Sequence, residues 1–172
     1  KKPEKTEQKE LIKGGIICGI IIFFASTIQQ IGISQTTVGK AGFISVLYIL
    51  IVPFFGLLMK QKLPKMIWIC CALAIAGLYL LCMNESLSIS NGDLVVLLSA
   101  VAYAIHILAI GHFAPKVDCV KLSCLQFLVC GVISVVVMFI FEKPNLQNIL
   151  NAWLPIIYAG ALSGGVGYTL QT

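Results

Sequence analysis

The chain has 172 residues, of which 59% are hydrophobic and 11% charged, and it carries a formal net charge of +5. A soluble domain of this size needs more charge to cover its surface, so the composition argues against a soluble helical bundle. Its 12 basic residues are all lysines that flank apolar stretches, and this scattering argues against a nucleic-acid partner.

Six apolar stretches divide the chain. An α-helix rises about 1.5 Å per residue, so roughly 20 apolar residues cross the hydrocarbon core of a bilayer, and each stretch has about that length. We therefore predict an all-α membrane protein with six transmembrane helices. The stretches are Gly14–Ile33, Ala41–Met59, Met66–Asn84, Leu94–Pro115, Leu122–Phe141 and Ala152–Thr172.

The first predicted helix follows a polar N-terminal segment, Lys1–Glu10, which we expect to be a loop. Gly15 and Gly19 have the GxxxG spacing that lets two helices approach closely, so we predict that this pair packs against another helix. The second predicted helix contains Pro53, which removes one backbone hydrogen bond and therefore predicts a kink.

The fourth predicted helix is preceded by Asn91-Gly92-Asp93, which has the composition of a turn followed by an N-cap. The sixth is rich in glycine, and Gly160 and Gly164 repeat the GxxxG spacing, for which we again predict packing. The first and sixth helices also share a Thr-apolar-Gln sequence, at Thr27–Gln29 and Thr169–Gln171, which fits duplication of a helical unit.

The distribution of lysines predicts the orientation. When the gaps between stretches are assigned alternately to two sides, ten lysines share a side with the N-terminal segment and two lie opposite. Lysines in short loops tend to stay in the cytoplasm, so the N-terminal segment is predicted to be cytoplasmic and the gaps with Lys40 and Lys143 to face outward. The chain starts without Met and stops within an apolar stretch, so we expect an internal fragment of a longer cell-membrane protein.

The 7 cysteines form no CxxC pair, and most lie in apolar stretches, where a thiol acts as a small hydrophobic group. Cys119, in a predicted loop, is the candidate for a reactive thiol. The sequence has no HExxH motif, no GxSxG motif and no acid within a predicted span. We therefore predict no catalytic residue, no metal site and no cofactor.

Polar side chains within the apolar stretches are the candidates for substrate contact. Gln29 and Gln30 are adjacent and therefore about 100° apart on a helix, so at least one should face a cavity or another helix. Hydrogen bonding between helices and contact with a substrate both remain open as interpretations.

Two further pairs have helical spacing. Tyr103 lies three residues before His106, on the same helical face, and Tyr168 and Gln171 repeat this spacing in the sixth helix. His106 titrates near neutral pH in water, so proton relay is an alternative to a hydrogen bond with a neighbouring helix. The six candidate substrate-binding residues are thus Gln29, Gln30, Tyr103, His106, Tyr168 and Gln171.

Several runs of residues are similar to EamA-type members of the drug/metabolite transporter superfamily. The resemblance covers nearly the whole chain, and most of its marks are small or apolar residues, so it points to a family and not to a substrate. The runs are Gln29–Ile33, Thr36–Ile44, Leu47-Tyr48, Val52-Pro53, Trp68 with Ala76–Leu81, Gly92–Leu94, Ala100–Ala104 and Gly167–Gln171.

The resemblance implies a bundle of ten helices in two inverted five-helix repeats. This chain would supply helices three to eight, with the end of the first repeat at residues 1–84 and the start of the second at 85–172. Many family members carry an acid about where this chain has Gln61, so no role of that acid is transferred.

The implied function is secondary transport of a small metabolite or drug-like solute across the cytoplasmic membrane by alternating access. The alternatives are a non-transporting membrane scaffold or sensor, and a membrane-embedded enzyme, which the lack of catalytic motifs disfavours. The expected partners are a small-molecule substrate and the lipid bilayer, and a homodimer is left open.

Overall fold

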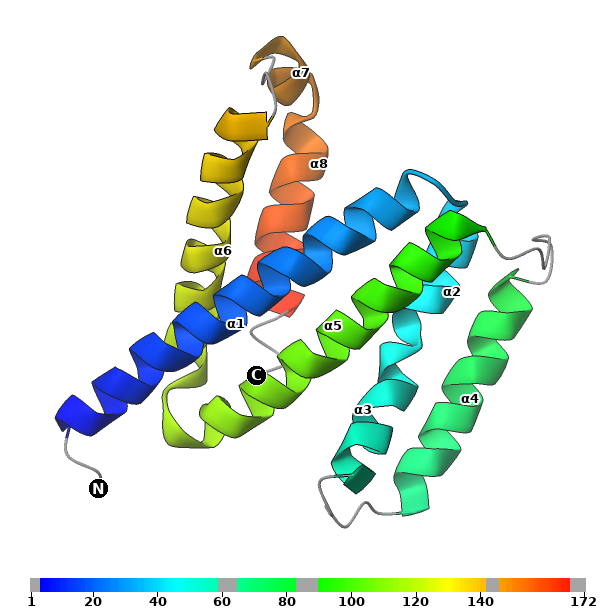
Figure 1. The fold of residues 1–172 in the computed structure, drawn as a ribbon, viewed down its shortest axis with the longest axis horizontal. Helices are drawn as coiled ribbons and strands as arrows, with labels where there is room; N and C mark the ends of the chain where they lie inside the picture. The colour runs from blue at the N-terminus through cyan, green and yellow to red at the C-terminus, as the bar shows by residue number, and fades with distance from the viewer. Residues whose placement is uncertain (1–3, 59–64, 83–89, 142–145, 168–172) are drawn as a thin grey trace. The chain divides into compact units, whose positions relative to one another are not determined.

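The structure is a computed structural model that describes residues 4–58, 65–82, 90–141 and 146–167. Within these ranges the chain is helical apart from short turns, which confirms the predicted all-α class (Figure 1). The elements are α1 (Glu4–Ile33), α2 (Val38–Val46), α3 (Tyr48–Leu58), α4 (Lys65–Cys82), α5 (Asn91–Phe113), the 3-10 turn η1 (Ala114–Lys116), α6 (Cys119–Phe141), α7 (Leu146–Asn151), α8 (Trp153–Ile157) and the π-helix η2 (Tyr158–Gly167).

Four helical segments of the described ranges are long and apolar enough to cross a membrane, namely Thr6–Ile33, Val38–Leu57, Asn91–Lys116 and Cys119–Phe141. The third predicted span corresponds to the shorter apolar helix α4. The sixth corresponds to α8 and η2, and its last residues lie outside the described ranges. The count of six spans therefore stays a prediction, whereas several membrane-crossing helices are present.

The chain divides into two compact units, and α1 and α5 each contribute to both. Unit 1 comprises residues Lys1–Phe23 and Ala109–Thr172, and unit 2 comprises Phe24–Leu108. This division follows spatial contacts and is not the predicted boundary between two repeats at residues 84–85, which stays a prediction.

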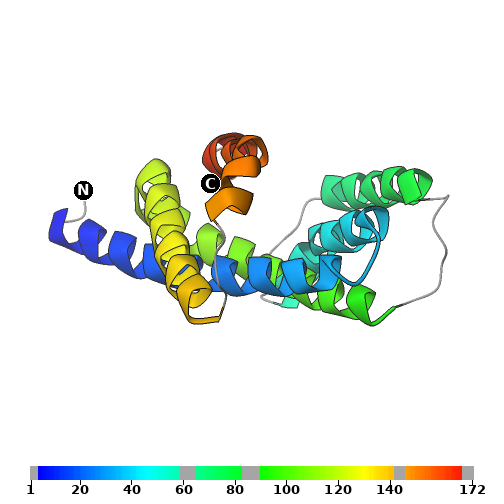
Figure 2. The ribbon, with the colours of Figure 1, turned by 90° about the horizontal axis from the view of Figure 1, so that it is seen from above.

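In unit 2, α2 and α3 lie between α4 on one side and the paired segments of α1 and α5 on the other (Figure 2). Phe54 of α3 meets Trp68 of α4 edge-on, with 5.7 Å between ring centroids. Tyr48 of α3 lies beside Tyr103 of α5 on the opposite side. The interrupted helix α2–α3 is thus the central element of this unit.

In unit 1, α1 crosses α6 at the first GxxxG pair. A Cβ atom added to Gly15 would lie 2.5 Å from the side chain of Leu125, and one added to Gly19 would lie 2.8 Å from the backbone oxygen of Gln126. The two backbones therefore approach closely because neither glycine has a side chain, which confirms the predicted packing role of this pair.

The hydrophobic core of unit 1 lies next to this crossing. It is formed by Cys18, Ile110, Phe113 and Leu122, all of which are buried. Cys18 is fully enclosed and so fills space as a small hydrophobic group, as predicted for the cysteines of the apolar stretches.

The second GxxxG pair differs from the first. A Cβ atom added to Gly160 would meet no described atom within 4 Å, and the side-chain surroundings of position 164 lie outside the described set. The described residues therefore give no support for the predicted packing of Gly160. The backbone here follows the rarely used π-helical path over Tyr158–Gly167.

The N-terminal segment was predicted to be a loop, and that prediction was wrong from Glu4 onward. α1 begins at Glu4 and continues without interruption to Ile33. The segment is rich in Glu, Lys and Gln, which are strong helix formers, and it extends a long apolar helix that has already nucleated.

Many large apolar side chains point away from the cores. Phe24 and Leu73 of unit 2 and Phe139 of unit 1 are each more than half exposed. Exposed apolar surface on this scale, on helices of membrane-crossing length, is expected where lipid replaces water as the solvent. These faces support a multi-pass membrane protein.

Candidate functional site

A hydrogen-bonded cluster joins three helices of unit 2 through one carboxamide. Gln29 of α1 donates from Nε2 to Oγ of Ser45 on α2, at 2.9 Å. Tyr103 of α5 donates its hydroxyl hydrogen to Oε1 of Gln29, at 3.0 Å. The ring of Tyr48 lies 6.4 Å from the ring of Tyr103, tilted by 42°. We call these four residues the Gln29 cluster.

The interruption between α2 and α3 places two members of the Gln29 cluster. The amide of Leu47 donates to the carbonyl of Ile44, three residues earlier, and the carbonyl of Leu47 accepts from the amides of Leu50 and Ile51. The regular helical hydrogen bonding is therefore interrupted at Leu47, although its backbone stays right-handed helical. Ser45 precedes this break and Tyr48 follows it. A broken helix beside polar side chains is a recurring feature of substrate sites in membrane transporters.

Pro53 lies inside α3, which continues through it to Leu58, and the predicted kink there stays a prediction. The interruption between α2 and α3 lies earlier, at Leu47. Pro53 has no amide hydrogen to offer the carbonyl of Ile49, four residues earlier. That carbonyl accepts a weak hydrogen bond from the thiol of Cys71 on α4, at 3.7 Å. The partner helix thus compensates for the proline within the apolar interior.

Close contact between α1 and α5 brings Gln29 and Tyr103 together. A Cβ atom added to Gly32 would lie 2.6 Å from Cγ2 and 2.8 Å from the backbone nitrogen of Val96. Such an approach is possible because Gly32 has no side chain. Gln29 lies one helical turn before Gly32, and Tyr103 lies two turns beyond Val96, so their long side chains meet below this contact.

The six predicted site residues have different surroundings in the structure. Gln29 and Tyr103 belong to the cluster and are half-buried. Gln30 is exposed, and His106, one turn beyond Tyr103, is fully buried. Tyr168 and Gln171 lie outside the described residues, as does Gln61. Sequence reasoning paired Tyr103 with His106, whereas the described hydrogen bond of Tyr103 joins it to Gln29.

A second polar cluster lies at the end of unit 2 where α1 ends and α5 begins. Asp93 accepts a hydrogen bond from the hydroxyl of Thr36, and its other carboxylate oxygen accepts from the amide of Ser90, at 2.8 Å. The ammonium of Lys40 lies 4.0 Å from that second oxygen. Asp93 is buried, so these donors replace the water that its charge would otherwise bind. We call these four residues the Asp93 cluster.

The start of α5 corrects one prediction. The helix begins at Asn91, so Asn91-Gly92-Asp93 is its first turn and not a preceding turn with an N-cap. Ser90 is the cap, since its hydroxyl oxygen accepts from the amide of Asp93 while Asp93 accepts from the amide of Ser90. Asp93 lies in the first turn of the apolar segment Asn91–Lys116, and the absence of an acid from the membrane interior stays a prediction.

A sequence signal for this cluster was present. Ser90-x-x-Asp93 before an apolar run is a capping box, in which the two residues bond to each other's backbone amides. The contribution of Thr36 and Lys40 had no such local signal, since Thr36 is separated from Asp93 by 57 positions.

The Asp93 cluster also bears on the predicted topology. It joins the gap after the first predicted helix to the gap before the fourth, so both gaps lie at the same end of unit 2. Alternate crossing requires this arrangement, since these two gaps were assigned to the same side. The side of the membrane that this end faces stays a prediction, and Lys143 lies outside the described residues.

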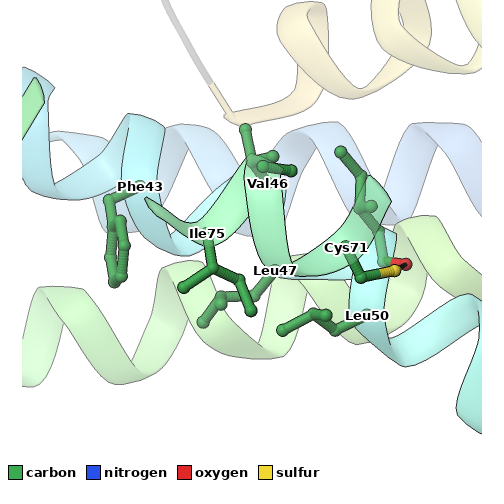
Figure 3. Close-up of a pocket in the computed structure, with 8 residues that line it drawn as sticks. Phe43, Val46, Leu47, Leu50, Cys71 and Ile75 are labelled. Atoms are coloured by element: carbon green, nitrogen blue, oxygen red, sulfur yellow. Dashed lines mark hydrogen bonds between the residues drawn. The ribbon is translucent and has the colours of Figure 1, made fainter. Parts of the chain in front are cut away.

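A small pocket beside the break in α2–α3 is not a suitable substrate site. It has a volume of about 10 Å³, near the minimum for one water molecule, and it lies against α4 around Leu47 and Cys71 (Figure 3). Its lining is apolar and consists of Phe43, Val46, Leu47, Ile49, Leu50, Cys71, Ala74 and Ile75. The Gln29 cluster therefore remains the better candidate for solute recognition.

The described residues contain no group of three or more His, Cys, Asp or Glu side chains arranged to hold a metal ion. Cys119, the predicted reactive thiol, is half-buried at the start of α6, with its sulfur 3.8 Å from the carbonyl oxygen of Ala114. The chemistry of the described sites is therefore that of hydrogen bonds and one ion pair.

Comparison with known proteins finds a family match over part of the chain. Residues 90–172 match the model of the EamA-like transporter family, which covers α5 and the elements that follow it. No curated protein and no solved structure matches the chain. The match lies where the sequence resembled the second repeat of EamA-type transporters.

Proposed function

We propose that this chain is part of a secondary carrier that moves a small metabolite or drug-like solute across the cytoplasmic membrane by alternating access, because residues 90–172 match the EamA-like transporter family. The family consists of membrane transporters, which supports transport over catalysis. The Gln29 cluster supports the proposal, because it places a polar side chain among apolar helices, next to the interruption between α2 and α3.

The proposed contact residue is Gln29, with Tyr103 and Tyr48 beside it. A carboxamide can donate two hydrogen bonds and accept two, and the two described bonds of Gln29 use one of each. A solute that carries a donor and an acceptor could exchange with Ser45 or Tyr103 without leaving a polar group unsatisfied. Such an exchange would change the ties among α1, α2 and α5 and thereby couple binding to movement.

The break at Leu47 supports alternating access in the same way. A helix whose regular hydrogen bonding is interrupted at Leu47 bends there more readily than a regular helix does. We propose that movement between α2 and α3 accompanies the passage of the solute, within a bundle of two inverted repeats divided near residues 84–85. The N-terminal segment is proposed to be cytoplasmic, and a homodimer stays a prediction.

Transport by the full-length protein in proteoliposomes tests this proposal. A panel of labelled metabolites and drug-like solutes is screened for uptake under solute and ion gradients, first with the unaltered protein. No flux for any member would contradict the carrier and favour the scaffold alternative.

The role of the cluster is tested with two neighbouring glutamines. Gln29→Leu removes the carboxamide that joins the three helices, and we expect it to reduce the flux strongly. Gln30→Leu is the matched control, because the same chemical change is made at an exposed position on the next residue. Equal losses in both variants would contradict a specific role of Gln29, even where the unaltered protein transports.

A further inference from the structure

We propose that the Asp93 cluster is a latch that closes one end of unit 2 over the Gln29 cluster, and that its release admits water and solute to that cluster. The inference rests on the proposed function only in taking the Gln29 cluster as the solute site. It assigns a role to Thr36 and Asp93 that neither the family match nor the sequence gives.

The first ground is that Asp93 of α5 interacts with residues of another segment, the α1–α2 connection and the start of α2. The Ser90 amide belongs to the start of α5 itself, but Thr36 belongs to the connection between α1 and α2, and Lys40 belongs to the first turn of α2. The carboxylate therefore holds the α1–α2 connection against the start of α5. A capping role alone would need neither Thr36 nor Lys40.

The second ground is burial. Asp93 is 5% exposed, and a carboxylate removed from water is stable only while its donors stay in place. Loss of the Thr36 tie would leave the carboxylate short of a donor, and we expect water to replace that donor as the connection separates from α5.

The third ground is position. Gln29 lies one helical turn before the end of α1, about 6 Å along its axis, and Ser45 lies about 10 Å from the start of α2. The connection tied by Asp93 joins these two helix ends. Between the two clusters, Gly32 packs directly on Val96, which brings α1 and α5 into close contact there.

Water access to position 45 tests the latch without any substrate. A Ser45→Cys variant of the full-length protein in lipid nanodiscs is treated with a charged, membrane-impermeant maleimide, and labelling is quantified for each cysteine by peptide mass spectrometry. We expect slow labelling at position 45 with the latch intact. Adding Asp93→Ala or Thr36→Val should raise its rate several-fold, and Lys40→Met should raise it less, because its 4.0 Å contact is the longest of the three.

A control outside the latch separates it from other effects. Asp118→Ala removes a carboxylate that likewise binds an amide of its own helix start, at the start of α6 in unit 1. It should leave the rate at position 45 unchanged.

General unfolding has a different signature. Cys18 and Cys71 are buried native cysteines, one in each unit, and a gate leaves both of them protected. The proposal is overturned by an unchanged rate at position 45 in Thr36→Val and Asp93→Ala, or by a parallel rise at Cys18 and Cys71. The labelling experiment does not depend on transport. A negative labelling result therefore contradicts the latch and not the carrier proposal, whereas an absence of flux contradicts the carrier proposal and not the latch.

Discussion

Gln29 of α1 and Tyr103 of α5 are joined by a 3.0 Å hydrogen bond in which the phenol donates to the side-chain carbonyl. The same carboxamide donates to Ser45, so a single side chain of α1 connects two other helices. Removing it leaves two polar groups without their described partner in an apolar setting. The Gln29 cluster therefore has a measurable role in stability as well as the proposed role in transport.

The coupling between Gln29 and Tyr103 is the first prediction. In a double-mutant cycle of Gln29→Leu and Tyr103→Phe, we expect a coupling free energy of about 0.6 kcal/mol, and no more than about 1.7 kcal/mol, as found for hydrogen bonds between membrane helices. Reversible unfolding in mixed micelles measures it. In the matched cycle of Gln30→Leu with Tyr103→Phe the effects should simply add, and equal coupling in both cycles would contradict the assigned bond.

The crossing of α1 and α6 gives the second prediction. Gly19→Ala places a methyl group 2.8 Å from a backbone oxygen that cannot move aside freely, so we expect it to lower the free energy of unfolding by about 1–3 kcal/mol. Gly131→Ala, on α6, meets no described atom within 4 Å and should raise stability by about 0.5–1 kcal/mol through helix propensity. Changes of the same sign at both positions would contradict the close approach at Gly19.

The pairing of Cys71 with Ile49 gives the third prediction. Cys71→Ala leaves the carbonyl of Ile49 without the thiol donor, and we expect destabilisation by about 1 kcal/mol. With Pro53→Ala in the background, residue 53 regains an amide hydrogen for that carbonyl, so the same change should have a smaller effect. Cys70→Ala is the control, since Cys70 is adjacent and exposed. Strict additivity of Cys71→Ala and Pro53→Ala would argue against compensation.

The cap of α5 gives the fourth prediction. Ser90→Ala removes the side-chain oxygen that accepts from the amide of Asp93, and losses of such caps lower stability by about 1 kcal/mol. Ser90→Gly should lower it by only a few tenths of a kcal/mol, because an N-cap glycine leaves the amide open to other acceptors. Unfolding monitored by circular dichroism in micelles distinguishes the two, and an equally small effect of both substitutions would contradict the capping role.

Sequence reasoning identified the helices because the length and composition of an apolar stretch are local properties. The boundaries at Ile33 and Phe141 match those of α1 and α6. The polar segment from Glu4 was misassigned because helix propensity, and not hydrophobicity, continues α1 there. The interruption at Leu47 was not predicted, because no glycine or second proline stands beside it in the sequence.

The candidate site was predicted in part. Gln29 and Tyr103 were recognised because polar groups are rare in apolar stretches, but their pairing spans 74 positions and depends on the register of α1 against α5. Ser45 was not singled out, since one hydroxyl in a helix carries no signal of its own. The cap of α5 was assigned to Asn91–Asp93 because the capping box formed by Ser90 and Asp93 was overlooked.

The sequence by itself determined an apolar, all-helical membrane protein and a resemblance to EamA-type transporters, because both depend on composition along the chain. Only the tertiary structure decided that the carboxamide of Gln29 joins α1, α2 and α5, and that Asp93 ties the α1–α2 connection to α5. It also decided that the thiol of Cys71 on α4 donates to the carbonyl of Ile49, which Pro53 leaves without an amide donor. These contacts depend on which faces of the helices meet, and nearly uniform apolar sequence does not specify a face.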